Sequence, residues 1–301
     1  MEPPIETVLV ATDGSDPADR AARHGIALAA TTGADLHALA VVDEAARRVA
    51  ETALAESDAD DVLTEAGEQA VASVADLAAD SPAAPSVTTA VRPGTPHRVI
   101  SEYADEHDVD VVVAGTEGRS GLDRVLLGSV AENVLRTSTR PVLVVPPGAG
   151  DPDADQTPYD ELLVPTDGSD GAEAATEWAI GLAEHYDAPL HALFAADATP
   201  FPTTVRSQQL LDALDTAGND AIEAVRQRGE AAGVDVVGAV GAGAPAPTIL
   251  EFCEDEPIDL VVMGSHGRSG LDRFLLGSVT EHVVREGDVP VFCVPMRESE
   301  D

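Results

Sequence analysis

The chain lacks lysine, and all 17 of its lysine-or-arginine positions are arginine. It therefore has no Walker A phosphate loop, which requires a lysine. Aromatic residues make up only 3%, and the only two cysteines are Cys253 and Cys293. These cysteines match no metal-binding spacing and lie in apolar runs, so we expect buried, reduced thiols. No apolar run reaches the length of a membrane-spanning helix and no signal peptide is evident, so we expect a soluble cytoplasmic protein.

Positive charge is scarce as well, because the 17 arginines face 55 acidic residues and the net charge is -38. Such a charge destabilises a compact fold through self-repulsion in dilute buffer. At molar salt the Debye length falls to about 3 Å and this repulsion largely disappears. We therefore expect adaptation to a salt-rich cytoplasm, such as that of a halophilic archaeon. Regular apolar runs argue against an acidic disordered chain, and the absence of a basic stripe argues against nucleic-acid binding.

One segment of thirteen residues occurs twice. "GRSGLDRVLLGSV" fills residues 118–130, and "GRSGLDRFLLGSV" fills residues 267–279, with a single difference. Other stretches repeat too, since "VLVATDGSD" at 8–16 corresponds to "LLVPTDGSD" at 162–170. Ordinary core segments of duplicated halves drift as long as volume and polarity survive. The near-identity therefore indicates a segment that is kept for what it binds.

The repeats predict two copies of one domain, each of about 150 residues, which is the commonest domain size. Between them lies "PPGAGDPDADQTP", a stretch rich in proline, glycine and aspartate that is typical of a linker. We predict domains at residues 1–147 and 159–301, joined by a linker at 148–158.

Within each copy, short apolar runs alternate with longer amphipathic stretches. In the first copy the predicted strands are 5–11, 36–42, 86–91, 110–114 and 141–145. The predicted helices are 17–31, a stretch within 44–79, 95–107 and 129–137. Strands that are apolar nearly throughout are typical of a parallel sheet buried on both faces. The order predicts an α/β fold with two tandem doubly wound, five-stranded parallel-sheet domains.

In such sheets ligands bind beyond the carboxyl ends of the strands, where the strand order reverses. "TDGS" follows the first strand of each copy, at residues 12–15 and 166–169. An aspartate at this point accepts a hydrogen bond from a ribose or a base. The same letters also suit a turn and a helix cap, with Ser15 or Asp16 as the cap of the first helix. Both interpretations stay open.

Glycines mark a second place, after the fourth strand. Gly115 and Gly118 remove side chains where a backbone approaches a ligand closely or turns sharply. Gly128 and Ser129 begin the next helix, whose free N–H groups and positive dipole end favour an anion. A phosphate chain between the glycines would meet these groups and the guanidinium of Arg119. A plain loop with glycine turns and a serine cap is the alternative.

The pattern G-x2-G-x9-G-[ST] after a fourth strand, with an aspartate after the first, resembles the nucleotide-binding motif of the universal stress protein (UspA) family. The resemblance covers nearly all of the chain and is to a tandem member with two domains of the adenine nucleotide alpha hydrolase-like fold. It implies ATP across the strand ends, with Mg²⁺ held through the nucleotide phosphates. It also implies a pseudo-dimer within the chain, formed by pairing of residues 141–145 with 290–294. A further homo-oligomer and a protein partner stay open.

The resemblance assigns site residues in both domains. In the first, Thr12, Asp13 and Val41 would surround adenine and ribose. The residues that would hold ribose and phosphates are Gly115, Gly118, Arg119, Gly128, Ser129 and Val130. The matching residues of the second domain are Thr166, Asp167, Ala195, Gly264, Gly267, Arg268, Gly277, Ser278, Val279 and Thr280.

The two sites differ in ways that favour the second. Thr280 supplies a hydroxyl where the first copy has Ala131. Glu117 places a carboxylate near the expected phosphates, where the second copy has His266. We therefore predict that the second site binds ATP better, although Ala195 offers less apolar contact to adenine than Val41.

The function expected from these residues is that of a stress-response protein that binds ATP and acts as a nucleotide-responsive regulator or scaffold. No Ser-His-Asp order and no G-x-S-x-G elbow occur. His37 and His191 match across the copies within the second strand, where packing is their expected role. We expect no catalytic residues and no protein-bound metal. A slow ATPase or phosphotransferase, and a dimerising stress module without nucleotide, are the alternatives.

Overall fold

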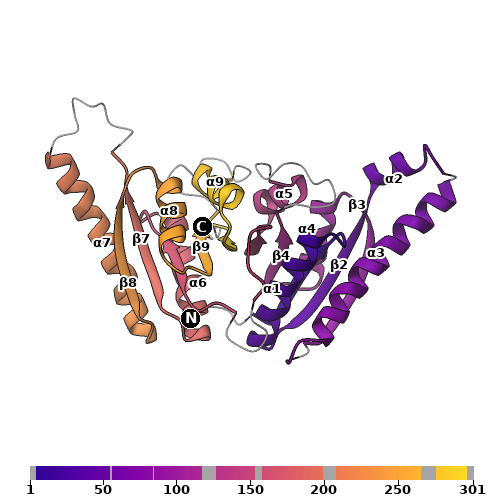
Figure 1. Ribbon diagram of the computed structural model, residues 1–301, viewed down its shortest axis with the longest axis horizontal. Helices are drawn as coiled ribbons and strands as arrows, with labels where there is room; N and C mark the ends of the chain where they lie inside the picture. The colour runs from indigo at the N-terminus through magenta and orange to yellow at the C-terminus, as the bar shows by residue number, and fades with distance from the viewer. Residues whose placement is uncertain are drawn as a thin grey trace. The chain divides into compact units, whose positions relative to one another are not determined.

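The computed structural model describes residues 5–54, 56–83, 85–116, 127–152, 158–198, 208–265 and 276–296. The chain separates between Pro158 and Tyr159 into two compact units, which we call the first and the second unit. Figure 1 shows the helices and strands of each.

The first unit is built on a parallel sheet. Its strands are β1 (Thr7–Thr12), β2 (Asp35–Asp43), β3 (Val87–Gly94), β4 (Val111–Gly115) and β5 (Val142–Val145). They lie in the order β3-β2-β1-β4-β5, and every described pair is parallel. The chain moves outward from β1 to β3 and then returns to place β4 on the other side of β1. The topological switch point is therefore between β1 and β4, where a doubly wound sheet binds ligands.

The described helices of the first unit are α1 (Asp16–Thr32), α2 (Glu44–Ala50), α3 (Glu56–Ala79), α4 (Pro96–Glu106) and α5 (Ser129–Thr137). Four of them pack on the sheet in two pairs. α1 contacts α3 and α4 contacts α5, while both pairs contact strands. This is the arrangement expected when helices cover both faces of a parallel sheet. The amphipathic stretch within 44–79 forms two helices, α2 and α3, where the sequence indicated one.

The second unit repeats this topology. Its strands are β6 (Leu162–Pro165), β7 (Leu190–Ala196), β8 (Val236–Ala242), β9 (Leu260–Gly264) and β10 (Val291–Val294), in the order β10-β9-β6-β7-β8. Its described helices are α6 (Asp170–Tyr186), α7 (Gln208–Ala232), α8 (Pro245–Asp255) and α9 (Ser278–Glu286). The predicted α/β fold, with two tandem doubly wound domains, is confirmed.

Buried strands and paired backbone groups explain why this order is stable. In β1, Val8, Leu9 and Val10 are all fully buried, because helices cover both faces of the central strand. The carboxylate of Asp110 accepts the backbone N–H groups of Glu6 and Thr7 through one oxygen, at 2.8 and 2.9 Å. Asp259 makes the same two bonds to the residues before β6. Each carboxylate thus fixes where the first strand of its unit begins.

Residues just after β5 pack on α1. His24, in α1, is 3% exposed, and its Nε2 lies 3.0 Å from the carbonyl oxygen of Gly150. Arg20 donates a hydrogen bond to the carbonyl of Pro147, and the carboxylate of Asp151 lies 3.9 Å from Arg20 and 3.8 Å from Arg23. The start of the proline- and glycine-rich stretch is therefore held by the first unit.

Among the described helices, none combines the length and the apolar character needed to cross a membrane.

Candidate functional site at the strand ends

A cavity of about 440 Å³ lies at the carboxyl ends of β1, β2 and β4 in the first unit. Its volume lies within the usual range for small-molecule sites. The residues assigned to this site that line it are Thr12, Asp13, Val41, Gly115, Gly128, Ser129 and Val130. Residues that follow three different strands thus meet at one point, as the switch-point rule predicts.

The "TDGS" segment serves both the helix and the cavity. Ser15 is the N-cap of α1, and its Oγ accepts the N–H of Ala18 at 3.4 Å. One oxygen of Asp13 accepts the N–H of Ser15 at 3.0 Å and its hydroxyl at 2.6 Å. The turn therefore holds the Asp13 carboxyl at the cavity wall. The cap interpretation is confirmed for Ser15, and it does not exclude a ligand-facing role for Asp13.

The N-terminus of α5 contributes donors to the same cavity. Gly128 is its N-cap and makes no side-chain cap bond, while its own N–H donates to the Thr116 carbonyl at 2.7 Å. Ser129 and Val130 form the first turn and line the cavity. A glycine cap leaves the first N–H groups of the helix without a side-chain acceptor. The positive end of the helix dipole therefore points to this space.

The second unit has a smaller cavity, of about 230 Å³, at the corresponding strand ends. The assigned residues that line it are Thr166, Asp167, Ala195, Gly264, Gly277, Ser278, Val279 and Thr280. Local geometry repeats as well: Ser169 caps α6, and Asp167 accepts its N–H at 3.0 Å. Gly277 is the N-cap of α9 and makes no side-chain cap bond.

Thr280 makes a bond within the protein that its first-unit counterpart, Ala131, does not make. The Thr280 hydroxyl donates to the carbonyl oxygen of Gly264 at 2.8 Å, and the residue is 2% exposed. A hydroxyl has a single proton to donate. The Thr280 hydroxyl therefore has no proton left to donate to a ligand. The prediction that the second site binds ATP better loses one of its two supporting arguments.

Four assigned residues lie outside the described residues: Gly118, Arg119, Gly267 and Arg268. The same holds for Glu117 and His266, on which the other reason for preferring the second site depends.

Part of the first cavity was not expected from the motifs. Pro96 and Ile100 of α4 line it, and Pro245 and Ile249 of α8 line the second cavity at matching positions. The first cavity is also lined by Ala40 and by four residues of α3, namely Leu63, Ala66, Gly67 and Ala70. The proline and isoleucine that recur at matching positions could have been recognised in the sequence as part of the site. The small residues of α3 could not, because such residues are common in any long amphipathic helix.

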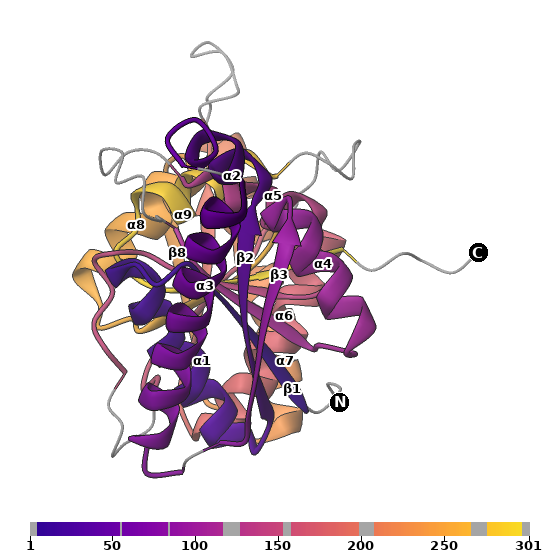
Figure 2. The ribbon, with the colours of Figure 1, turned by 90° about the vertical axis from the view of Figure 1, so that its right-hand side faces the viewer.

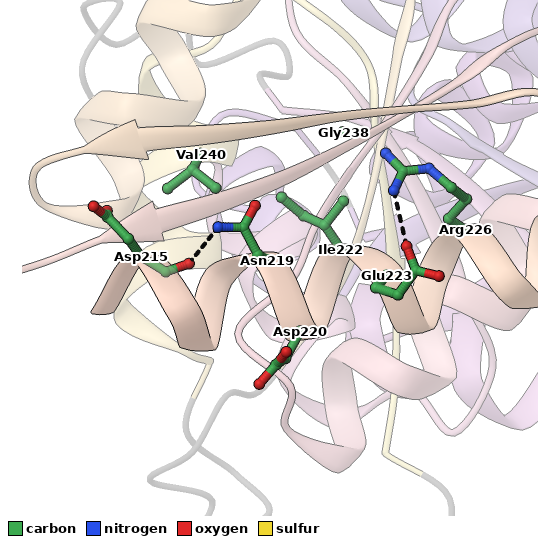
Figure 3. Close-up of a pocket in the computed structure, with 8 residues that line it drawn as sticks. All are labelled: Asp215, Asn219, Asp220, Ile222, Glu223, Arg226, Gly238 and Val240. Carbon is green, nitrogen blue, oxygen red and sulfur yellow. Dashed lines mark hydrogen bonds and ion pairs between the residues drawn. The ribbon is translucent and has the colours of Figure 1, made fainter. Parts of the chain in front are cut away.

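Another hollow, of about 720 Å³, lies between α7 and β8. Figure 3 shows Arg226 turned toward Glu223, to which it donates a hydrogen bond at 2.9 Å, while Asp220 points away from the strand. Asn219 donates to the carbonyl of Asp215 at 2.7 Å. Two of its polar side chains, Arg226 and Asn219, thus form hydrogen bonds within α7 itself, and we place the candidate site at the strand ends instead.

The two matched histidines pack against rings and also form hydrogen bonds. His37 Nδ1 lies 2.9 Å from the Tyr103 hydroxyl, and burial, followed by the nearby His107, lowers the pKa of His37. His191 Nε2 lies 2.7 Å from a carboxylate oxygen of Glu161, and its ring contacts Phe252. In the described parts of the chain, no group of three or more His, Cys, Asp or Glu residues is placed to hold a metal ion.

Two successive doubly wound units, each with a cavity at its switch point, define a tandem α/β protein. Comparison of the chain with models of known protein families identifies its class more specifically. The model of the universal stress protein family matches residues 4–146 and 158–295. The chain belongs to the universal stress protein family, with one copy of the family domain in each matched segment.

Individual relatives agree with this assignment. Universal stress protein MJ0531 of Methanocaldococcus jannaschii is 37% identical over 139 residues, which cover 45% of this chain and 82% of that protein. A universal stress protein of Mycolicibacterium smegmatis is 34% identical over 197 residues, 62% of each chain. The crystal structure of a universal stress protein from Archaeoglobus fulgidus DSM 4304 has the same fold, with a TM-score of 0.72, 22% identity and coverage of 98% of this chain and 97% of that one.

Proposed function

We propose that this protein binds ATP or a related adenine nucleotide at the strand ends of one or both units, and acts in a stress response as a nucleotide-responsive regulator or scaffold. The observation that carries the proposal is the meeting of Asp13, Val41 and the α5 N-terminus around one cavity of about 440 Å³. These groups come from places as far apart as residues 13 and 129 of the sequence, yet each suits a different part of a nucleotide.

The chemistry of the wall supports this assignment. Leu39 and Val41 offer apolar contact to a base, and Asp13 offers an acceptor to an amino or hydroxyl group. The free N–H groups at the start of α5 favour phosphate oxygens. Mg²⁺, where present, would be held mainly by the phosphates, because it binds few protein carboxylates in such complexes.

The proposal is tested by titrating ATP with Mg²⁺ into the pure protein in molar KCl, by calorimetry. We expect binding by the wild type and a loss of about 10- to 100-fold in affinity at each site whose aspartate is replaced, in Asp13→Ala and Asp167→Ala. The size follows from losing a hydrogen bond to a charged group. Asp16→Ala, on the exposed start of α1, is the matched control. A steady release of heat that continues after the sites are saturated with ATP would indicate hydrolysis and favour the slow ATPase.

If circular dichroism shows an intact fold and no ATP binds, the proposal is overturned and the alternative of a dimerising stress module that binds no nucleotide is left. If a variant with both Asp13→Ala and Asp167→Ala binds ATP as tightly as the wild type, the ligand lies elsewhere.

We also propose that the protein works in a salt-rich cytoplasm, on the strength of its net charge of -38. Raising KCl from about 0.1 M to about 1 M shortens the Debye length from about 10 Å to about 3 Å. The thermal midpoint should rise by several degrees or more over this range, because self-repulsion among carboxylates is screened. A midpoint that stays constant or falls would contradict this proposal. The pairing of residues 141–145 with 290–294 stays a proposal that rests on the family resemblance.

A further inference from the structure

Each unit ends in an outer strand, β3 in the first and β8 in the second. Among the strands that the structure describes, β3 pairs only with β2, and β8 pairs only with β7. Figure 2 shows β3 beside β2. One side of each outer strand therefore presents backbone N–H and C=O groups to which no described strand is paired. Such an edge is a template for pairing with another chain, and proteins commonly block it with charged side chains or proline.

The edge of β3 is blocked in this way. Leu36 donates its N–H to the carbonyl of Ser86, so the even-numbered residues of β3 direct their backbone groups to β2 and the odd-numbered ones direct them outward. Pro93 is one of the outward residues, and it has no N–H to donate. The adjacent Arg92 adds a charged side chain, whose guanidinium is bonded to Glu106 at 2.7 Å.

The edge of β8 has none of this protection. The residues that stand in β8 at the places of Thr88, Arg92 and Pro93 are small or apolar, namely Val237, Gly241 and Ala242. The whole strand, Val236–Ala242, contains neither a charged residue nor a proline. Val237 and Val240 are 46% and 39% exposed, and their odd spacing places them on opposite faces of the strand. The second unit therefore ends in an apolar strand with an open backbone edge.

The backbone of β8 is arranged to accept another strand. Leu190 donates its N–H to the carbonyl of Asp235, so the odd-numbered residues of β8 face β7. The even-numbered residues, among them Gly238 and Val240, direct their N–H and C=O groups outward. An added antiparallel strand would bond to these residues.

The side chains of β8 are complementary to a second copy of the same strand. Two β8 strands that pair antiparallel over their whole length have their twofold axis at Ala239, the middle residue. Val240 of one copy then lies opposite Gly238 of the other, and Val237 lies opposite Gly241. Each exposed valine thus stands beside a residue without a side chain, on both faces of the joined sheet. The pairing removes apolar surface from water without a clash between the two strands.

Charges beside β8 follow the same symmetry. A Cβ on Gly238 would lie 3.1 Å from Nη2 of Arg226, so this guanidinium lies at the Gly238 end of the hollow between α7 and β8. Asp215 lies at the other end, near Val240 (Figure 3). Antiparallel pairing brings the Gly238 end of one copy to the Val240 end of the other, and with it Arg226 toward Asp215 of the second copy. Because Glu223 adds a further carboxylate there, the association requires screening by salt.

We propose that β8 is a self-association edge, at which two copies of this chain pair antiparallel about Ala239 and continue the sheet from one second unit into the other. A second copy supplies the strand, the glycines opposite the valines and the opposite charges together, and these assign it as the occupant. The proposal does not depend on nucleotide binding. It also uses a different strand from the pairing proposed for residues 141–145 and 290–294.

The first test is sedimentation equilibrium of the full chain over a range of protein concentrations. We expect a monomer–dimer equilibrium that shifts toward the dimer as KCl rises from about 0.1 M to about 1 M, because the carboxylates are then screened. Ala239→Arg places like charges opposite each other at the twofold axis and should weaken the dimer at least about tenfold. Ala90→Arg, at the corresponding position of β3, is the matched control and should leave the dimer unchanged.

The second test concerns the register and uses Cys253→Ser, which removes the half-buried thiol. In the proposed dimer the two Ala239 residues form a pair that is not hydrogen-bonded, with Cα atoms about 4.5 Å apart. This distance lies within the range of a disulfide. Mild oxidation should therefore link two chains in Ala239→Cys. It should not do so in Val237→Cys, whose partner across the strands is Gly241.

Either test is able to overturn the inference. A wild type that stays monomeric in about 1 M KCl would do so. A dimer that Ala239→Arg does not weaken would also do so, because the contact would then lie on another surface. Circular dichroism establishes that each variant is folded, and if Ala239→Arg does not fold, the cross-linking pair decides. Equal cross-linking of Ala239→Cys and Val237→Cys would contradict the proposed pairing.

Discussion

Acidification from pH 6.5 to pH 4 should destabilise the first unit by about 3 kcal/mol through a single side chain, His24. Burial lowers the pKa of His24 from 6.5 to about 4, although the Gly150 carbonyl and Asp151 act in the opposite direction. The folded state therefore keeps the ring neutral in a range where the unfolded state binds a proton. This contribution to stability is fully present above pH 6.5 and is lost as the pH falls through 4.

The measurement is urea unfolding of the wild type and His24→Gln at steps between pH 7 and pH 4, followed by far-UV circular dichroism. Glutamine keeps a donor for the Gly150 carbonyl and does not titrate. The difference between the two proteins cancels the titration of the shared carboxylates. We expect His24→Gln to be the less stable protein at pH 7 and to lose that disadvantage by pH 4. A difference that stays constant with pH would show that His24 does not titrate in this way.

Periodicity and repeats were enough to predict the fold. The ends of the apolar runs lie no more than three residues from the ends of β1 to β5, because strands buried on both faces must be apolar along their whole length. Ser129 and Thr137 bound α5 as predicted. The helices within 44–79 were harder to predict. α2 has no buried residue and therefore no apolar stripe that distinguishes it from a loop.

The motifs of the sequence indicated the polar wall of each cavity better than its apolar wall. All the assigned residues that the structure describes line one of the two cavities. The aspartate turns and the glycine caps are local features with a local pattern. The apolar wall of the first cavity depends on the packing of Ala40 beside Gly67, which are 27 positions apart on different elements. Such a fit is decided by packing between elements, and no local pattern encodes it.

The second unit should lose about 3–5 kcal/mol of stability in Phe292→Ala, the range for truncating a buried aromatic side chain. Phe292, in β10, is 1% exposed, and its ring centroid lies 5.3 Å from that of Trp178 in α6. Trp178 is the only tryptophan of the chain, so its emission reports on the second unit alone. Phe292→Leu is the matched control, because the first unit has Leu143 at this position, and it should cost much less.

These two predictions concern the same place in the two units, since Trp178 stands in α6 where His24 stands in α1. One copy filled the space between helix and last strand with an aromatic pair. The other kept a smaller strand residue, Leu143, and a polar ring that bonds to the Gly150 carbonyl. The unfolding transition reported by Trp178 should therefore not show the pH dependence described for His24. In Phe292→Ala its midpoint should shift to lower urea by a similar amount at pH 7 and at pH 5. A loss of less than about 1 kcal/mol in the free energy of unfolding would mean that neighbouring side chains refill the space left by the ring.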